Sequence, residues 1–211
     1  MKREIDYSLY LVTDRDLMSA PDLETAVERA VKGGCTLVQL REKTAGSREF
    51  FETAVRVKAV TDSYGVPLII NDRLDIALAA DADGVHIGQD DLPADVARRL
   101  IGSGKILGVS ASSLGEAEEA VCAGADYLGI GAMFATGTKT DADLATMDEL
   151  RRIRRALSIP IVVIGGINQA TAPSFRDIGI DGLAVVSAII GAPDIEAASR
   201  EMREVWDGFK R

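Results

Sequence analysis

Short runs of apolar, often β-branched residues alternate along the chain with longer stretches whose apolar positions recur at helical spacing. Eight short runs are predicted to be strands: Leu9 to Thr13, Thr36 to Arg41, Pro67 to Asn71, Gly84 to Gly88, Ile106 to Ser110, Tyr127 to Gly131, Ile161 to Gly165 and Leu183 to Ser187. Helices are predicted to begin between them near Leu23, Ser47, Leu74, Ala94, Leu114, Met147 and Ala170, and a last helix covers about Asp194 to Phe209. Strict alternation of strand and helix indicates a parallel α/β protein.

The eightfold repetition of this strand-helix unit predicts a closed barrel. Strands that are apolar along nearly their whole length are typical of parallel sheets that helices cover. We therefore expect a single (β/α)8 TIM barrel, one catalytic domain spanning residues 1–211. A doubly wound open sheet is the structural alternative, but no Gly-x-Gly-x-x-Gly turn follows the first strand. No Pro-rich, Ser-rich or low-complexity linker divides the chain.

Composition narrows the functional classes without changing this fold. The net charge of −9 argues against a nucleic-acid surface, because such surfaces gather Lys and Arg. No apolar run approaches the roughly 20 residues that a membrane span needs, and the charged N-terminus is unlike a signal peptide. Cys35 and Cys122 each lie near a glycine, without a second cysteine or a histidine at metal-ligand spacing. Buried reduced thiols and a cytoplasmic location are therefore expected.

Polar residues follow the predicted strands at the same end of each one. Asn71 and Asp72, for example, come directly after the apolar run Pro67 to Ile70. In a parallel barrel the carboxyl ends of all strands share one face, where active sites lie. We therefore expect one rim to gather the polar residues and glycines Thr13, Asp14, Arg41, Lys43, Asn71, Asp72, Asp91, Ser110, the loop Thr136 to Lys139, Gly165, Gly166 and Ser187.

Two carboxylates at this rim, Asp72 and Asp91, follow neighbouring predicted strands. Two carboxylate ligands beside phosphate oxygens form the kind of site that Mg²⁺ accepts. The alternative is that each aspartate caps a helix, Asp72 the one near Leu74 and Asp91 the one that opens at Pro93.

Cationic residues at the same rim predict an anion site. Arg41 and Lys43 are one residue apart after the second strand, so their side chains point the same way in an extended chain. A guanidinium and an ammonium group together suit a diphosphate. Lys139 would add a third cation from the loop after the sixth strand, which is suited to closing over a ligand. The alternatives are a solvated pair bridged by Glu42 and a merely exposed loop.

The last two strands predict a second anion site of another kind. Gly165 and Gly166 end the seventh strand, and Val186 and Ser187 end the eighth, where barrels commonly bind phosphate through backbone N–H groups. A tight turn is the alternative for the glycines. The sole histidine, His86, lies within a strand and is predicted to be packed rather than catalytic. Cations, Mg²⁺ ligands and hydroxyls without an obvious general base suit the departure of a diphosphate.

Motifs along nearly the whole chain resemble the thiamine-phosphate synthase family. The segments that carry the resemblance are Leu9 to Asp14, Val38 to Lys43, Ile70 to Arg73, Gly84 to Asp91, Gly108 to Ser110, Gly124 to Gly131, Thr136 to Lys139, Ile164 to Ile167 and Val185 to Ser187. The resemblance implies a transferase that couples hydroxymethylpyrimidine diphosphate to a thiazole phosphate and gives thiamine monophosphate and pyrophosphate.

The resemblance also implies a role for each matching residue. Its pyrimidine-diphosphate site corresponds to Gln39, Leu40, Arg41, Glu42, Lys43, Asn71, Ser110 and Lys139. Its thiazole-phosphate site corresponds to Thr136, Thr138, Gly166, Val186 and Ser187, and its Mg²⁺ ligands to Asp72 and Asp91. The implied catalytic residues are Arg41, Lys43, Ser110 and Lys139, with the three cations and Mg²⁺ stabilising the leaving diphosphate. The thiazole nitrogen then attacks, and no base is required.

Small departures from the family pattern affect no ligand. Ser112 and Ser113 stand where a His-Thr or similar pair is common, and Ala135 stands where the loop often has Pro. Two rival functions are a thiazole tautomerase-like barrel, which would need only the second anion site, and a non-catalytic barrel that binds a phosphate metabolite. The sequence leaves open whether the chain forms a homo-oligomer and whether a carboxylated thiazole is preferred.

Overall fold

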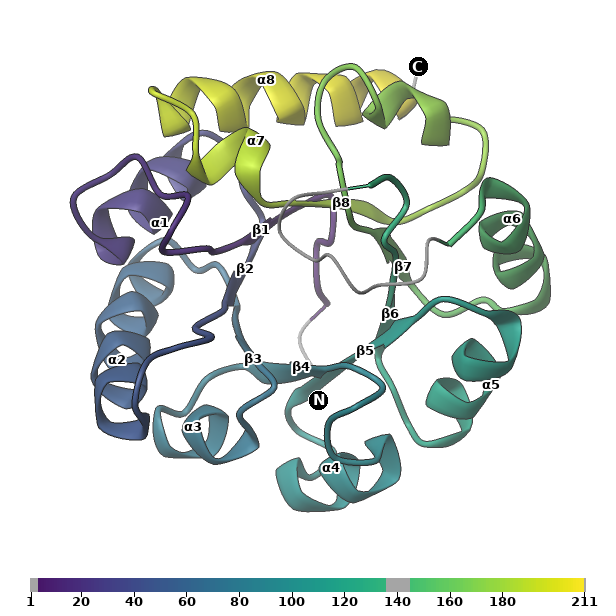
Figure 1. Ribbon diagram of the computed structural model, residues 1–211, viewed down its shortest axis with the longest axis horizontal. Helices are drawn as coiled ribbons and strands as arrows, with labels where there is room; N and C mark the ends of the chain where they lie inside the picture. The colour runs from purple at the N-terminus through teal and green to yellow at the C-terminus, as the bar shows by residue number, and fades with distance from the viewer. Residues whose placement is uncertain (1–3, 136–144, 211) are drawn as a thin grey trace.

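Eight parallel strands close into the predicted barrel (Figure 1). The computed structural model describes residues 4–135 and 145–210. The strands are β1 Leu9–Val12, β2 Leu37–Leu40, β3 Leu68–Asn71, β4 Gly84–Ile87, β5 Ile106–Ala111, β6 Tyr127–Ile130, β7 Ile161–Val163 and β8 Gly182–Val185. β1 closes the ring by pairing with β8, where Tyr10 lies opposite Ala184. The (β/α)8 TIM barrel is confirmed and the open-sheet alternative is wrong, while the domain bounds 1–211 stay a prediction.

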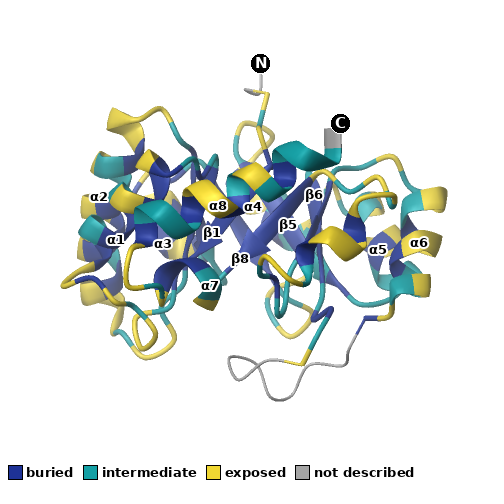
Figure 2. Ribbon diagram, turned by 90° about the horizontal axis from the view of Figure 1, so that it is seen from above, coloured by how far each residue is buried: buried dark blue, intermediate teal, exposed yellow. Residues whose placement is uncertain are grey.

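Helices surround the barrel and return the chain to the start of each next strand (Figure 1). They are α1 Leu23–Lys32, α2 Ser47–Ser63, α3 Leu74–Ala79, α4 Ala94–Ile101, α5 Leu114–Cys122, α6 Met147–Ala156, α7 Ser187–Ile190 and α8 Ile195–Asp207, with the 3-10 turns η1 Ala172–Phe175 and η2 Gly208–Lys210. Figure 2 shows the buried strands at the centre and the exposed faces of the helices outside them.

Helix α1 shows how the sequence produces these outer helices. Asp22 lies at its N-cap, and its carboxylate accepts a hydrogen bond from the backbone N–H of Thr25 at 2.7 Å. Its buried residues recur at helical spacing, so one face packs against the barrel: Leu23, Ala26, Val27, Ala30 and Val31. Gly33 follows the helix, and a Cβ there would lie 2.3 Å from the backbone oxygen of Glu196. Glycine therefore lets α1 and α8 approach each other closely.

Successive strand residues point alternately into two buried layers. Leu9 and Leu11 belong to the layer between strands and helices, whereas Tyr10 and Val12 point into the barrel interior. The interior is not wholly apolar, because Gln39 also lies within it and is only 4% exposed. Buried polar groups need hydrogen-bond partners, so the barrel interior must supply them.

Two elements near the end of the barrel differ from the sequence prediction. The helix expected from Ala170 is replaced by turns and the short η1. The side-chain oxygen of Asn168 accepts hydrogen bonds from the N–H groups of Ala170 and Thr171 at 2.9 and 3.1 Å, as at the start of a helix. Pro173 offers no N–H to the carbonyl four residues before it, so the turn does not continue as an α-helix. Ser187, expected to end the eighth strand, instead begins α7.

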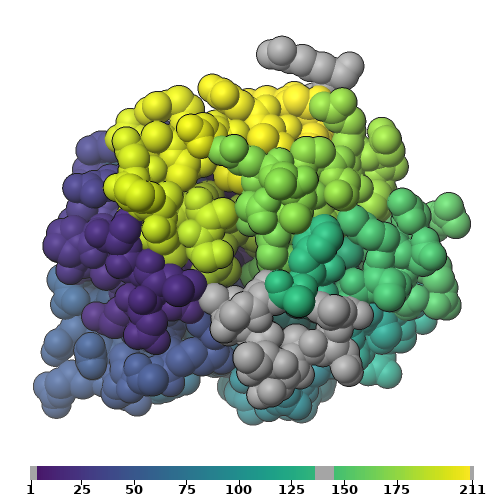
Figure 3. Space-filling view, turned by 45° about the horizontal axis from the view of Figure 1, so that its top comes forward, coloured from purple at the N-terminus to yellow at the C-terminus, as the bar shows by residue number. Residues whose placement is uncertain are grey.

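Segments from both ends of the chain lie side by side where the barrel closes. In Figure 3 the purple segment that follows β1 borders the yellow-green segment that contains α7. The backbone N–H of Ser19 donates to the oxygen of Ile190 at 3.0 Å, and the Ser19 hydroxyl donates to the oxygen of Ala192 at 2.6 Å. The loop after β1 is therefore fastened to the last strand-helix unit.

The two cysteines differ in burial, so the expectation for one of them is wrong. Cys35 is buried, but Cys122 is exposed, and both thiols are free. Cys122 is the last residue of α5, whose buried positions are Ala117 and Ala120, so it falls outside the face that packs on the barrel.

We expect a thiol reagent to label one cysteine in the native protein and two after unfolding. Burial raises the pKa of the Cys35 thiol to about 12, which keeps it protonated as well as inaccessible. The measurement is a count of labelled thiols with and without denaturant, and Cys122→Ser should abolish the native signal. Labelling of Cys35 in the folded protein would contradict the burial described here.

In the described part of the chain, no helix is both long and apolar enough to cross a membrane. The cytoplasmic location expected from the cysteines stays a prediction.

Candidate active site

The carboxyl ends of β3 and β4 bring together the two aspartates that the sequence singled out. The Asp72 carboxylate accepts a hydrogen bond from Lys43 Nζ at 3.1 Å, and the Asp91 carboxylate accepts one from the N–H of Gly88 at 2.7 Å. Burial raises the pKa of Asp91, and the neighbouring Asp72 carboxylate raises it further. Two carboxylates that repel each other in this way are suited to sharing a cation.

Helix capping does not account for either aspartate. Helices α3 and α4 are preceded by Arg73 and Pro93, and neither helix has a side-chain hydrogen bond at its N-cap. Asp72 instead has a positive φ of 61°, which an aspartate tolerates better than most residues do. Its backbone N–H donates to the oxygen of His86 at 2.8 Å, which fixes the turn that directs the carboxylate.

The two cations after β2 each contact a carboxylate of a neighbouring rim segment. Arg41 Nη1 lies 3.1 Å from Asp14 Oδ2, and Lys43 pairs with Asp72. Glu42, which was to bridge them in the alternative interpretation, is instead held by Arg15 Nε at 3.1 and 3.2 Å. Arg41 and Lys43 are therefore positioned by separate partners, and both remain at the rim where an anion could bind between them.

Polar side chains that precede the rim residues lie deeper in the barrel. Gln39 is buried in β2, and its Nε2 donates to the Tyr10 hydroxyl at 2.8 Å. Ser110 in β5 lies 2.9 Å from His86 Nε2, measured from its Oγ. Asn71 ends β3 half-buried and lies opposite His86 in the strand pairing. These groups form the floor below Arg41, Lys43 and the aspartates.

Leu40 stands apart from the other predicted site residues. Its side chain is fully buried in the layer between strands and helices. Any contact that Leu40 makes with a ligand must therefore come from its backbone.

His86 is packed, as its position in the strand predicted, but it also contacts a predicted site residue. Its imidazole is 8% exposed, and its ring centroid lies 5.4 Å from that of Tyr127. One ring nitrogen contacts the Tyr127 hydroxyl and the other contacts Ser110. Sequence reasoning missed Tyr10 and Tyr127, because an aromatic residue within an apolar strand run is most simply explained by packing.

Gly165 and Gly166, after β7, adopt positive φ angles of 95° and 68°. A Cβ at Gly166 would lie 2.7 Å from the Cβ of Phe134, so only glycine fits this close approach. The backbone oxygen of Gly166 accepts a hydrogen bond from the Thr171 hydroxyl at 2.8 Å, which fixes the turn. On the adjacent strand end, Val186 precedes α7 and Ser187 begins it. The predicted backbone phosphate site stays a prediction on these residues.

Three predicted site residues lie outside the described residues: Thr136, Thr138 and Lys139. Among the residues that the structure describes, no three His, Cys, Asp or Glu side chains gather into a group that could hold a metal ion. A metal held by Asp72 and Asp91 would therefore take its remaining ligands from water or from a bound phosphate.

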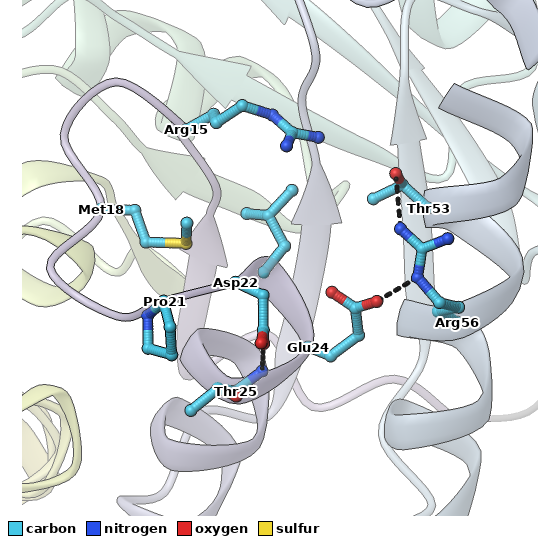
Figure 4. Close-up of a pocket in the computed structure, with 9 residues that line it drawn as sticks. Arg15, Met18, Pro21, Asp22, Glu24, Thr25, Thr53 and Arg56 are labelled. Atoms are coloured by element: carbon cyan, nitrogen blue, oxygen red, sulfur yellow. Dashed lines mark hydrogen bonds and ion pairs between the residues drawn. The ribbon is translucent and has the colours of Figure 1, made fainter. Parts of the chain in front are cut away.

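A cavity of about 340 Å³ lies beside this rim, between the loop after β1 and helices α1 and α2 (Figure 4). Arg15 lines it from the loop, and Thr53 and Arg56 line it from α2. Arg56 is not free to bind an anion, because it forms an ion pair with Glu24 and donates to Thr53 at 3.2 Å. Arg15, which lines the cavity, also forms the ion pair with Glu42. Neither Asp72 nor Asp91 lines this cavity.

Comparison with known proteins places these residues in a family. The family described as thiamine monophosphate synthase matches residues 9–189. A thiamine-phosphate synthase of Clostridium beijerinckii is 63% identical over 96% of this chain and 97% of its own. One from Chloroflexus aurantiacus is 54% identical over 94% of this chain and 92% of its own.

Solved structures agree with this assignment. A thiamine phosphate pyrophosphorylase from Pyrococcus furiosus superimposes with a TM-score of 0.89 at 40% identity and covers 97% of both chains. A 3-hexulose-6-phosphate synthase from Salmonella typhimurium, at 19% identity and a TM-score of 0.70, covers 95% of this chain and 99% of its own and shares the fold alone. The family match, the full-length relatives and the shared fold agree, and the chain belongs to the thiamine monophosphate synthase family.

Proposed function

We propose that this protein is a thiamine-phosphate synthase. It would transfer the hydroxymethylpyrimidine group from its diphosphate to the nitrogen of a thiazole phosphate, giving thiamine monophosphate and pyrophosphate. The observation that carries the proposal is the cluster of Asp72, Asp91, Arg41 and Lys43 at one rim, which joins a carboxylate pair to two cations. The names of its full-length relatives support the same activity.

The proposed reaction needs a stabilised leaving group rather than a base. The bond between the methylene carbon and the diphosphate oxygen breaks, and its electron pair leaves with the diphosphate. The lone pair of the thiazole nitrogen then forms the new carbon–nitrogen bond, so no proton has to be removed. Groups that bind the negative charge of the transition state more tightly than they bind the substrate would account for the rate.

The cations and carboxylates divide this work. Arg41, held by Asp14, would bind oxygens of the diphosphate, and Lys43 would exchange Asp72 for the same anion. Asp72 and Asp91 would hold Mg²⁺, which supplies positive charge to the diphosphate oxygens when bound. Burial and, after it, the neighbouring Asp72 carboxylate raise the pKa of Asp91, and a cation between the two carboxylates would offset both effects. Lys139 would add a third positive charge from outside the described residues.

The remaining residues would bind the two rings. Gln39, Asn71 and Ser110 are proposed to contact the pyrimidine substrate, with the backbone of Leu40 and Glu42 beside them. Backbone groups of Gly166, Val186 and Ser187, with Thr136 and Thr138, are proposed to bind the thiazole phosphate. A tautomerase-like or non-catalytic barrel would have no use for the carboxylate pair and its two cations. A homo-oligomer, a carboxylated thiazole and a cytoplasmic location stay predictions.

We expect the purified protein to form thiamine monophosphate and pyrophosphate from both substrates and Mg²⁺. Chromatography should show both products, and a chelator should stop their formation until Mg²⁺ is restored. Incubation with the thiazole phosphate alone serves as the control, since a tautomerase would convert it without the pyrimidine. Absence of both products with verified substrates would contradict the proposed function.

A further inference from the structure

Five side chains from five strands form a continuous hydrogen-bonded chain through the barrel interior. Gln39 Nε2 lies 2.8 Å from the Tyr10 hydroxyl, which lies 2.8 Å from the Tyr127 hydroxyl. The Tyr127 hydroxyl lies 2.8 Å from His86 Nδ1, and His86 Nε2 lies 2.9 Å from Ser110 Oγ. We call this set the interior chain. It joins Gln39 to Ser110, two residues that the proposed function assigns to the pyrimidine substrate.

Burial makes these contacts decisive for where each hydrogen lies. Tyr127 is fully buried, Tyr10 is 1% exposed and Gln39 is 4% exposed, so water does not compete for their polar atoms. Burial also raises the pKa of both tyrosine hydroxyls above the ordinary value, so they keep their hydrogens at neutral pH. Each hydroxyl therefore has one hydrogen to donate, and its oxygen accepts from the remaining neighbours, which for Tyr127 include Gln39 as well as Tyr10.

The direction of donation then follows from the Gln39 end. An amide nitrogen can only donate, so the Tyr10 oxygen accepts from Gln39 and its hydrogen goes to Tyr127. Tyr127 in turn donates to His86 Nδ1, which leaves the imidazole hydrogen on Nε2. That hydrogen is donated to Ser110, so the hydroxyl hydrogen of Ser110 is directed away from His86.

We propose that Tyr10, Tyr127 and His86 are positioning residues that fix the hydrogen-bonding character of both ends of the interior chain. Gln39 is held so that its side-chain oxygen is the group left to accept, and Ser110 so that its hydroxyl is the group left to donate. This deepens the proposed function and rests on it: an aminopyrimidine diphosphate carries an amino group that donates and ring nitrogens and phosphate oxygens that accept. If every hydrogen bond of the interior chain ran the other way, Gln39 would present a donor to the amino group of the substrate. Ser110 would then present an acceptor to the ring nitrogens or phosphate oxygens, which are acceptors themselves.

The direction of donation can be measured without substrate, because His86 is the sole histidine. A nitrogen-15 NMR spectrum of the labelled protein at neutral pH should show one imidazole with its hydrogen on Nε2 and none on Nδ1. A hydrogen on Nδ1 would mean that the interior chain runs the other way or is broken, and would overturn the proposal. This result does not depend on activity, so it stands apart from any failure of the proposed function.

A double-mutant cycle tests whether Tyr127 acts through Ser110. Tyr127→Phe should raise the KM for the pyrimidine diphosphate about tenfold, the effect of one lost hydrogen bond, with the KM for the thiazole phosphate unchanged. In a Ser110→Ala background the same change should cost less than about twofold, because the hydroxyl that Tyr127 orients is gone. A full tenfold loss in that background would show that Tyr127 acts by packing alone.

Tyr7→Phe provides the matched control. The Tyr7 ring packs against Tyr127 with centroids 5.1 Å apart, yet Tyr7 is not a member of the interior chain. Removing its hydroxyl should leave the KM for the pyrimidine diphosphate and the His86 spectrum unchanged. A change in Tyr7→Phe as large as that in Tyr127→Phe would overturn the proposal, because any lost tyrosine oxygen would then have the same effect.

Discussion

Replacing Asp72 by asparagine is expected to lower kcat/KM by about two to three orders of magnitude, the loss seen when one group that stabilises transition-state charge is removed. The carboxylate lies beside Asp91 and pairs with Lys43 at 3.1 Å. Without its charge, the rim loses half of the proposed Mg²⁺ site and the partner that orients Lys43. The measurement is steady-state formation of thiamine monophosphate across a range of Mg²⁺ concentrations, where the half-saturating Mg²⁺ concentration should also rise.

Asparagine is a sharper test than alanine because of the backbone at this position. Asp72 has a φ of 61°, a conformation that asparagine and aspartate tolerate and that alanine adopts at a cost of roughly 1–2 kcal/mol. An alanine variant would therefore combine loss of charge with strain in the turn after β3. Asp72→Asn changes the charge alone, and its circular dichroism and unfolding midpoint should match those of the parent protein.

Asp81→Asn is the matched control for this variant. Asp81 also has a positive φ, 48°, and also pairs with a lysine, since Lys105 Nζ lies 2.7 Å from its carboxylate. It lies before β4, at the opposite end of the barrel from the rim. The same chemical change there should leave kcat/KM and the Mg²⁺ dependence unchanged. Activity in Asp72→Asn as high as in Asp81→Asn would show that Asp72 has no part in metal or diphosphate binding.

The barrel was predictable because its signal is repeated. Each strand is a short apolar run, most of them followed by polar residues or glycines, and the pairing of β1 with β8 follows once eight such units exist. The ends of the elements were less predictable, because they depend on single contacts. Pro173 interrupts the helix expected from Ala170, and its effect does not appear in the periodicity of apolar residues.

The candidate site was predictable to the extent that chain geometry determines it. Residues directly after parallel strands share one rim in any barrel, so Arg41, Lys43, Asp72 and Asp91 could be grouped from their positions alone. Their partners could not be predicted. Arg15 pairs with Glu42, and Arg41 pairs with Asp14. Both pairings depend on the path of the loop after β1, which the sequence pattern does not specify.

The interior chain was missed for a different reason. Tyr10 and Tyr127 sit in apolar strand runs, where an aromatic residue is most simply explained by packing. The interior side of the barrel is narrow, so inward residues of non-adjacent strands meet there, and Tyr127 contacts both Tyr10 and His86. Such a meeting depends on the stagger of the strands around the barrel, which the sequence pattern does not specify.

Gly108→Ala is expected to destabilise the protein by a clearly measurable amount. Gly108 lies in β5 between His86 on β4 and Tyr127 on β6, opposite both in the strand pairing. A Cβ there would lie 2.2 Å from Tyr127 Cζ and 2.4 Å from His86 Nδ1. The hydrogen bond between these two side chains passes over Gly108, so a methyl group must displace at least one of them.

The expected loss in the free energy of unfolding is about 1–3 kcal/mol, typical of overpacking in a core, with a larger value if the buried hydrogen bond is left unmade. For a chain of this size each kcal/mol lowers the unfolding midpoint by about 2–4 °C. Fluorescence of Trp206, the sole tryptophan and 5% exposed, provides the measurement during thermal and denaturant unfolding. The His86 resonances should shift in the same variant, because its Nδ1 partner is displaced.

Gly115→Ala makes the same chemical change where the structure has room for it. Gly115 lies in the first turn of α5, and a Cβ there would meet nothing within 4 Å. Alanine should therefore stabilise the protein by about 0.4–1 kcal/mol, because it restricts the unfolded chain and favours the helix. The two variants are thus expected to shift the unfolding midpoint in opposite directions. Equal midpoints would show that the barrel interior can yield at Gly108, and that Tyr127 and His86 are not held as tightly as their contacts indicate.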